Sequence, residues 1–190
     1  TYVGFSAGKG PSAGANANNV GVGSSALGAI TTGSLNTVVG FQAADELLTG
    51  TSNTIVGGRA FNAADGSEGN NVVIGADAGS GIDHDSTDGN IIIGHDAGTG
   101  GGAALIGCIA IGRNSMNSTA ANAQTGTIAI GHDALTALTS GAENTAVGYK
   151  SGLNLTTNAG NTYVGYESGE SASGNVHHYN TGVGQKVLKA

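Results

Sequence analysis

The chain has 190 residues, including 36 glycines, one proline, one cysteine and no tryptophan, and its formal net charge is −7. So much glycine excludes a helical bundle, because each glycine inside a helix costs about 1 kcal/mol relative to alanine, and the lack of a Gly-X-Y period excludes collagen. The acidic balance excludes ordinary nucleic-acid binding, which depends on a basic surface.

One eight-residue pattern recurs eleven times along the chain. It consists of Asn, a β-branched residue, any residue, Val or Ile, Gly, two variable residues and a small residue, as in N-T-V-V-G-F-Q-A at 36–43. The glycines that anchor the copies are 17, 18 or 19 residues apart. A repeat of this length indicates a solenoid, and the unbroken array predicts a single repeat domain over residues 1–190. The anchor glycines are Gly4, Gly23, Gly40, Gly57, Gly75, Gly94, Gly112, Gly131, Gly148, Gly165 and Gly184.

Each repeat is expected to contribute one short strand. The residue before every anchor glycine is Val or Ile, and the residue three before it is Thr, Val or Ile, whereas the residue between them varies from Gly to Tyr. Branched residues at i and i+2 have the period of a strand, and we predict that they face inward. In chain order the expected strands occupy residues 1–3, 20–22, 37–39, 54–56, 72–74, 91–93, 109–111, 128–130, 145–147, 162–164 and 181–183.

The positions around the strand favour stacking of one coil on the next. Asn precedes the strand in most copies, with Cys108 and Thr127 as two exceptions, and stacked amides can form a hydrogen-bonded ladder. The anchor glycine suits a sharp bend or a positive φ. The remaining residues of each repeat, rich in Gly, Ser, Thr, Asn and Ala, are interpreted as a connecting turn and loop.

These observations predict an all-β parallel β-solenoid, or β-roll, of about eleven coils with one repeat of 17–19 residues per coil. Coils stacked about 4.8 Å apart give a rod roughly 50 Å long. Because each coil has few core residues, we expect several chains to associate side by side.

The strand cores C-I-A-I-G at 108–112 and T-I-A-I-G at 127–131 resemble the S-V-A-I-G core of YadA-like head repeats in trimeric autotransporter adhesins. The segment N-T-A-V-G-Y-K-S-G at 144–152 is similar to repeats of phage tail-fibre-like proteins. The resemblance spans essentially the whole chain, although the YadA-like repeat is shorter. It implies a left-handed β-roll in a homotrimer, with the chain as a fragment of a longer extracellular cell-surface fibre or virion tail fibre.

The most acidic loop is a candidate metal site. Asp83, Asp85 and Asp88 lie between two glycines in G-I-D-H-D-S-T-D-G at 81–89, and carboxylate oxygens are the ligands that Ca²⁺ prefers. The spacing differs from that of an EF-hand and no bidentate Glu follows, so a solvated turn is the favoured interpretation.

Rings recur in the column that follows the anchor glycines. His132, Tyr149 and Tyr166 lie on consecutive coils, which makes them candidate ligand-binding residues for a sugar. Packing between chains is the favoured interpretation, because Tyr and Phe are frequent at interfaces. The sequences His95-Asp96 and His132-Asp133 are not interpreted as acid–base pairs, because adjacent strand residues point to opposite faces.

We therefore expect a non-enzymatic structural and adhesive module of an extracellular trimeric fibre, without a catalytic residue or a cofactor. Its partners would be two further copies of the chain and a receptor on a host or prey cell, with carbohydrate as a candidate. No nucleic acid partner is expected, and no apolar run approaches the roughly 20 residues of a membrane span.

Two other functions fit parts of the repeat. A left-handed β-helix acyltransferase fits one hexad per coil, at 93–98 and 130–135, but the next hexad would need an aliphatic residue where Thr99 and Thr136 stand. Ice binding ranks last, because it needs outward threonine columns and the threonines here share the face predicted to be buried.

Overall fold

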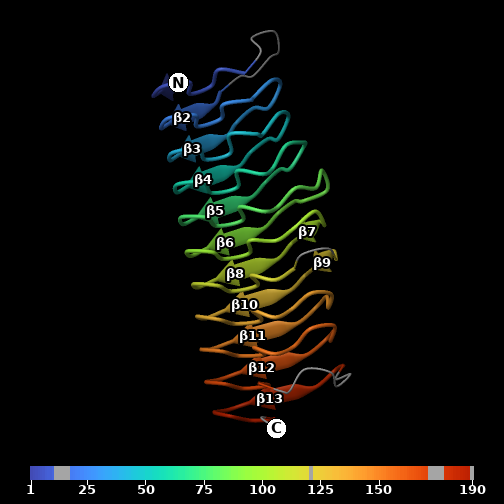
Figure 1. Ribbon diagram of the computed structural model, residues 1–190. Helices are drawn as coiled ribbons and strands as arrows, with labels where there is room; N and C mark the ends of the chain where they lie inside the picture. The colour runs from blue at the N-terminus through green and yellow to red at the C-terminus, as the bar shows by residue number, and fades with distance from the viewer. Residues whose placement is uncertain (11–17, 120–121, 171–177, 189–190) are drawn as a thin grey trace.

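The computed structural model describes residues 1–10, 18–119, 122–170 and 178–188. Within these residues the secondary structure consists of short strands and turns, without a helix. Eleven strands form one parallel sheet in which nearly every neighbour in the sheet is the next strand of the chain (Figure 1). They are β1 (Tyr2–Val3), β2 (Val20–Val22), β3 (Thr37–Val39), β4 (Thr54–Val56), β5 (Val72–Ile74), β6 (Ile91–Ile93), β8 (Ile109–Ile111), β10 (Ile128–Ile130), β11 (Thr145–Val147), β12 (Thr162–Val164) and β13 (Thr181–Val183).

Every repeat pairs with the next in the same register. For example, Val38 pairs with Ile55 and Ile92 pairs with Ala110, so equivalent positions of the repeat form straight columns along the stack. The first and last strands, β1 and β13, lie at opposite ends of this stack (Figure 1). The predicted all-β parallel β-solenoid is confirmed, and it has about nine turns. The left-handed coil and the count of eleven coils stay predictions.

The strands face the opposite way from the prediction. In β2 to β6, β8 and β10 to β13 the central residue is buried and its two neighbours are partly or largely exposed. Val38 and Ile55 have no exposed surface, whereas Val39 and Val56 are 38% and 37% exposed. The prediction that the branched residues face inward is therefore wrong: the variable column lines the core, and the uniform columns of Thr, Val and Ile face outward.

Two positions of each coil share the space in the core: the centre of the strand and the residue four positions after the anchor glycine. Ile92 at the first position is matched by Gly98 at the second, and Ala110 is matched by Met116. A Cβ atom added to Gly98 would lie 3.2 Å from Ile92 Cγ2. A large residue at one position thus leaves room only for a small one at the other, as close packing requires. The same exchange occurs in the pairs Tyr2 and Gly8, Gly21 and Leu27, Ala129 and Leu135, and Tyr163 and Gly169.

Two coils that depart from this exchange are balanced by their neighbours. Ile55 and Phe61 are both large, and the Phe61 ring reaches the next coil, where its Cδ2 would lie 3.3 Å from a Cβ atom on Gly79. Ala146 and Gly152 are both small, and Leu135 Cδ2 fills the space, 2.7 Å from the position of a Cβ atom on Gly152.

The segment predicted as loop also contributes to the core. A buried column stands seven residues after the anchor glycine, and it includes Ile30, Leu47, Ala64, Ile82, Leu138 and Leu155. Nearby, β7 (Leu105–Ile106) pairs in parallel with β9 (Gln124–Thr125), and isolated bridges join Gly69 to Asp88 and Asp88 to Ile106. The coil therefore has a second wall opposite the main sheet rather than a free loop.

The predicted asparagine ladder is confirmed. Asn53 donates hydrogen bonds to Asn36 Oδ1 from its side-chain Nδ2 and from its backbone N–H, each at 3.0 Å, and its Nδ2 also donates to the Glu68 carbonyl at 2.9 Å. Amide-to-amide bonds of this kind link consecutive coils from Asn19 to Asn90 and from Asn144 to Asn180. Between these runs the ladder is interrupted by Cys108 and Thr127.

The bend after each strand depends on glycine. The anchor glycines have φ between 127° and 150°, a region that other residues rarely adopt. Their backbones also lie close together, since a Cβ atom on Gly94 would be 2.6 Å from the Gly112 carbonyl oxygen. The second and fourth residues after the glycine also have positive φ, including non-glycine residues such as Asp96 (54°) and Met116 (49°).

Candidate functional site

One candidate site is the outward side of the main sheet, which we call the branched face. It consists of the two columns of Thr, Val and Ile that flank the buried strand centres. At the middle of the stack Val56 and Ile74 are each 37% exposed, and at the two ends Val3 and Val183 are 56% and 66% exposed. Neither column contains a charged residue, so the branched face is a long, regular and largely apolar strip.

A ladder of rings runs along the stack just after the anchor glycines, formed by the ligand-binding candidates His132, Tyr149 and Tyr166. The structure brings them together: the ring centroids of His132 and Tyr149 are 5.6 Å apart, those of Tyr149 and Tyr166 are 5.3 Å apart, and both pairs are stacked. Tyr149 and Tyr166 are 39% and 45% exposed. The three rings that the sequence places in one column therefore stack on one another in the structure.

The stacking limits what these rings can bind. Both faces of the Tyr149 ring are occupied by its neighbours, and Lys150 Nζ lies 5.3 Å from the ring centroid. A sugar that packs on an aromatic ring needs a free face, whereas this stack presents mainly its edges. Binding of a sugar by these residues stays a prediction, and the geometry favours their packing against another apolar surface.

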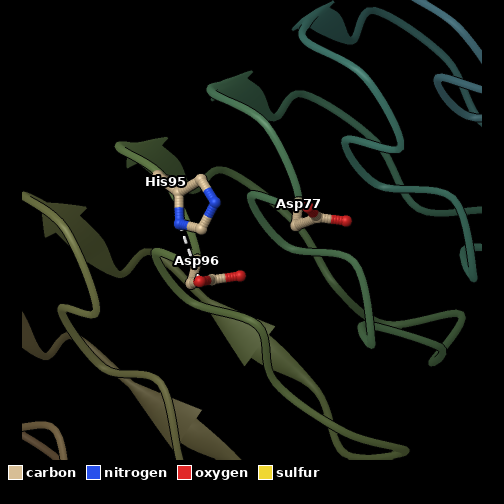
Figure 2. Close-up of side chains that lie close together, drawn as sticks. All are labelled: Asp77, His95 and Asp96. Carbon is tan, nitrogen blue, oxygen red and sulfur yellow. Dashed lines mark ion pairs between the residues drawn. The ribbon is translucent and has the colours of Figure 1, made fainter.

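The two His–Asp sequences do form contacts, contrary to the expectation that their side chains diverge. Both follow the anchor glycine and so lie in the turn rather than in a strand. His95 Nδ1 is 2.7 Å from Asp96 Oδ2 (Figure 2). His132 Nδ1 is 2.9 Å from Asp133 Oδ2, without the angle of a hydrogen bond.

His95 and Asp96 also lie close to Asp77 of the neighbouring coil (Figure 2). A metal-ligand atom of each of these three residues is within 4.8 Å of the other two. Asp77 is already bound by Arg59, whose Nε and Nη2 donate to its two carboxylate oxygens at 2.8 and 3.0 Å. Because Arg59 already occupies both carboxylate oxygens of Asp77, this cluster is the weaker candidate for a metal ion.

A second group consists of carboxylates alone. Asp65 and Glu68, in the loop before β5, and Asp83, in the loop before β6, place carboxylate oxygens within 4.8 Å of one another. The negative charge of Asp83 and a hydrogen bond between the two carboxyls raise the pKa of Asp65. Burial raises the pKa of Glu68, which has no exposed surface. The Asp65 shift thus reflects two carboxyls held close together, whereas the Glu68 shift reflects the removal of its carboxyl from solvent.

The predicted metal residues Asp83, Asp85 and Asp88 do not converge on one point. Asp85 Oδ1 accepts a hydrogen bond from the Ser67 backbone N–H at 3.2 Å, and Asp88 Oδ1 accepts one from Asn70 Nδ2 at 2.7 Å. Of the three, the described clusters include only Asp83. Its neighbours Asp65 and Glu68 come from the preceding coil and were missed in the sequence. The signal was present, because Asp65 and Asp83 are 18 residues apart, the same distance as Gly57 and Gly75.

The lone cysteine is a packed thiol. Cys108 is 1% exposed, its backbone N–H donates to Asn90 Oδ1 at 2.8 Å, and its Sγ is 3.5 Å from the Gln124 carbonyl oxygen. Burial raises the pKa of the thiol, which keeps it protonated and unreactive at neutral pH.

Comparison with protein-family models, with curated proteins and with solved structures finds no match. In the part of the chain that the structure describes, no helix has the length and apolar character of a membrane span.

Proposed function

We propose that the chain is a stiff, non-enzymatic module of an extracellular homotrimeric fibre, and that its branched face packs against two further copies of the chain. The observation that carries this proposal is the uniformity of the outward columns, which contain only Thr, Val and Ile at every coil. A solvated strand face is ordinarily polar, and a contiguous apolar strip of this length is typical of an interaction surface.

The free energy available on this face is considerable. Covering the remaining apolar surface of a half-exposed Val or Ile contributes about 1 kcal/mol, and the gain recurs at each coil. The sum over the stack is large enough to offset the roughly 4–15 kcal/mol that association costs.

A second copy of the chain is the occupant that fits best. A partner that contacts the branched face along its whole length needs the same axial spacing, and another copy has that spacing in its own columns. The absence of charge lets like faces approach without repulsion. The ring stack of His132, Tyr149 and Tyr166 begins two residues after the outward Val or Ile of each strand, across the bend at the anchor glycine.

The number of three chains, the left-handed coil and the extracellular fibre rest on the resemblance of the repeats to YadA-like heads and phage tail-fibre-like proteins. In such a fibre the solenoid provides length and stiffness, and the assembly attaches to a receptor on a host or prey cell. Carbohydrate is the receptor chemistry we propose.

A lysine in the branched face tests the assembly. Val56→Lys places a charge in the centre of the strip, and we expect it to reduce the trimer to a folded monomer. Thr51→Lys is the matched control, because Thr51 is exposed in the same coil and lies outside the branched face. Sedimentation equilibrium should give a trimer for the wild type and for Thr51→Lys. An unchanged mass for Val56→Lys would overturn the proposal.

Ice binding is a second candidate, because the strand threonines face outward, whereas the sequence predicted that they would be buried. Thr37 and Thr54 are exposed on adjacent strands, as ice binding requires. Five positions of the same column are nevertheless Val or Ile, and the other column contains no threonine. Thermal hysteresis of a monomeric chain would favour ice binding over the fibre.

The acyltransferase alternative would need three regular strands in each coil. The described coils share a single long sheet, and their second wall has only the β7–β9 pair and two isolated bridges. An acyl-CoA transfer assay tests this alternative.

A further inference from the structure

We propose that Asp65, Glu68 and Asp83 form a Ca²⁺ site that joins two adjacent coils through the loops that precede β5 and β6. The proposal is independent of the fibre function, since it concerns residues of a single chain that do not belong to the branched face.

The spacing of the three carboxylates suits a single calcium ion. Their oxygens lie within 4.8 Å of one another. Two oxygens that bind the same Ca²⁺ at about 2.4 Å can be separated by at most about 4.8 Å. The cluster contains only hard oxygen ligands, which favours Ca²⁺ over zinc or copper.

The buried carboxylate gives the strongest indication of a ligand. Glu68 is fully buried, and its Oε2 accepts a hydrogen bond from the Gly66 backbone N–H at 3.0 Å. Its Oε1 is buried without any hydrogen-bond partner among the described residues. A buried carboxylate oxygen that lacks a partner is costly, and a cation between Glu68 and the two aspartates would satisfy it.

Among the described residues, no positively charged side chain forms an ion pair with these carboxylates. The ion pairs of the described chain involve Asp77, Asp96, Asp133 and Glu167, and none includes Asp65, Glu68 or Asp83. Asp65 and Asp83 are exposed, so an ion can enter from solvent and keep water molecules as its remaining ligands.

The loops that carry the ligands are already held together. The Ser67 backbone N–H donates to Asp85 Oδ1 at 3.2 Å, and the Ser67 hydroxyl donates to the Asp85 carbonyl at 3.1 Å. These bonds join the loop of Asp65 and Glu68 to the loop of Asp83, and they lie next to the cluster. The site is therefore positioned before any ion binds.

Calcium titration of the full chain by isothermal calorimetry tests the site. We expect one Ca²⁺ per chain, with affinity weakened at least about tenfold in Glu68→Gln and in Asp83→Asn, because each substitution removes one charged ligand. Asp88→Asn and Asp77→Asn are the controls and should bind as the wild type does, since these carboxylates are bound by Asn70 and Arg59.

Thermal unfolding provides a second measurement. Ca²⁺ should raise the midpoint of unfolding relative to chelator in the wild type and in Asp88→Asn, and it should leave the midpoint of Glu68→Gln unchanged. The proposal is overturned if the wild type binds no Ca²⁺ or if Glu68→Gln binds within twofold of the wild type. It is also overturned if Asp77→Asn and Asp88→Asn lose as much Ca²⁺ affinity as Glu68→Gln does, because the overall negative charge of the chain would then account for the binding.

Discussion

At the scale of single residues, the core is filled jointly by two positions of each coil. Ile92 occupies the space that Met116 occupies one coil further on, and Gly98 and Ala110 leave that space open. Neither column is uniform by itself, but in most coils a large residue in one column is matched by a small residue in the other, and neighbouring coils compensate where this exchange fails. This is why the core column looked like a tolerant surface position in the sequence, and why the uniform outward columns looked like the core.

The exchange predicts that one substitution can rescue another. Ile92→Ala alone should cost about 2–5 kcal/mol of unfolding free energy through the cavity it leaves, and Gly98→Met alone should clash with Ile92. Together they reproduce the pair Ala110 and Met116, and Met116 has the φ of 49° that residue 98 requires (50°).

Urea unfolding of the two single variants and the double variant measures this coupling. The double variant should be more stable than the sum of the single effects by at least about 1 kcal/mol. Simple additivity of the two effects would contradict joint filling of the core.

The buried thiol gives a prediction about reactivity. Because burial raises the pKa of Cys108, less thiolate is present in the folded chain than in the unfolded chain at any pH between neutral and the raised value. We expect iodoacetamide at pH 8 to modify the folded chain at least about tenfold more slowly than the chain in denaturant. Mass spectrometry of the adduct follows the reaction, and equal rates would show that the thiol is accessible.

At the scale of the repeat, the sequence predicted the strands and the asparagine ladder but not the second wall. Strand positions followed from the i, i+2 pattern, and the ladder followed from a column of identical amides. The second wall was missed because its buried column, such as Leu47 and Ile82, has one aliphatic residue per repeat within polar and glycine-rich surroundings. The partners of Asp83 were missed for a related reason: they become neighbours only when one loop stacks on another.

The bend between strand and second wall depends on glycine for two separate reasons, conformation and close approach. Gly94→Ala should cost at least about 1–3 kcal/mol from the strained φ alone, and its Cβ atom would lie 2.6 Å from the Gly112 carbonyl oxygen. Gly58→Ala is the control, because Gly58 has no neighbouring atom within 4 Å of an added Cβ atom and no positive φ.

Thermal unfolding of the two variants distinguishes these positions. Gly58→Ala should stay within about 0.5 kcal/mol of the wild type. If both variants were equally stable, the bend would not depend on its glycine.

At the scale of the whole molecule, the repeat makes an in-register stack with a continuous apolar surface along its main sheet. The apolar surface is the branched face, and the exposed carboxylates Asp65 and Asp83 of the proposed Ca²⁺ site lie outside it, in the loops before β5 and β6. A fibre assembled through the branched face would leave these loops at its surface, where solvent and a receptor can reach them.

The mass of the wild-type chain in solution tests the central claim most directly. With a chain mass of 18.3 kDa, native mass spectrometry and sedimentation equilibrium should both give three times that value at micromolar concentration. A folded, stable monomer under the same conditions would show that the branched face does not bind further copies of the chain, and it would contradict the proposed fibre.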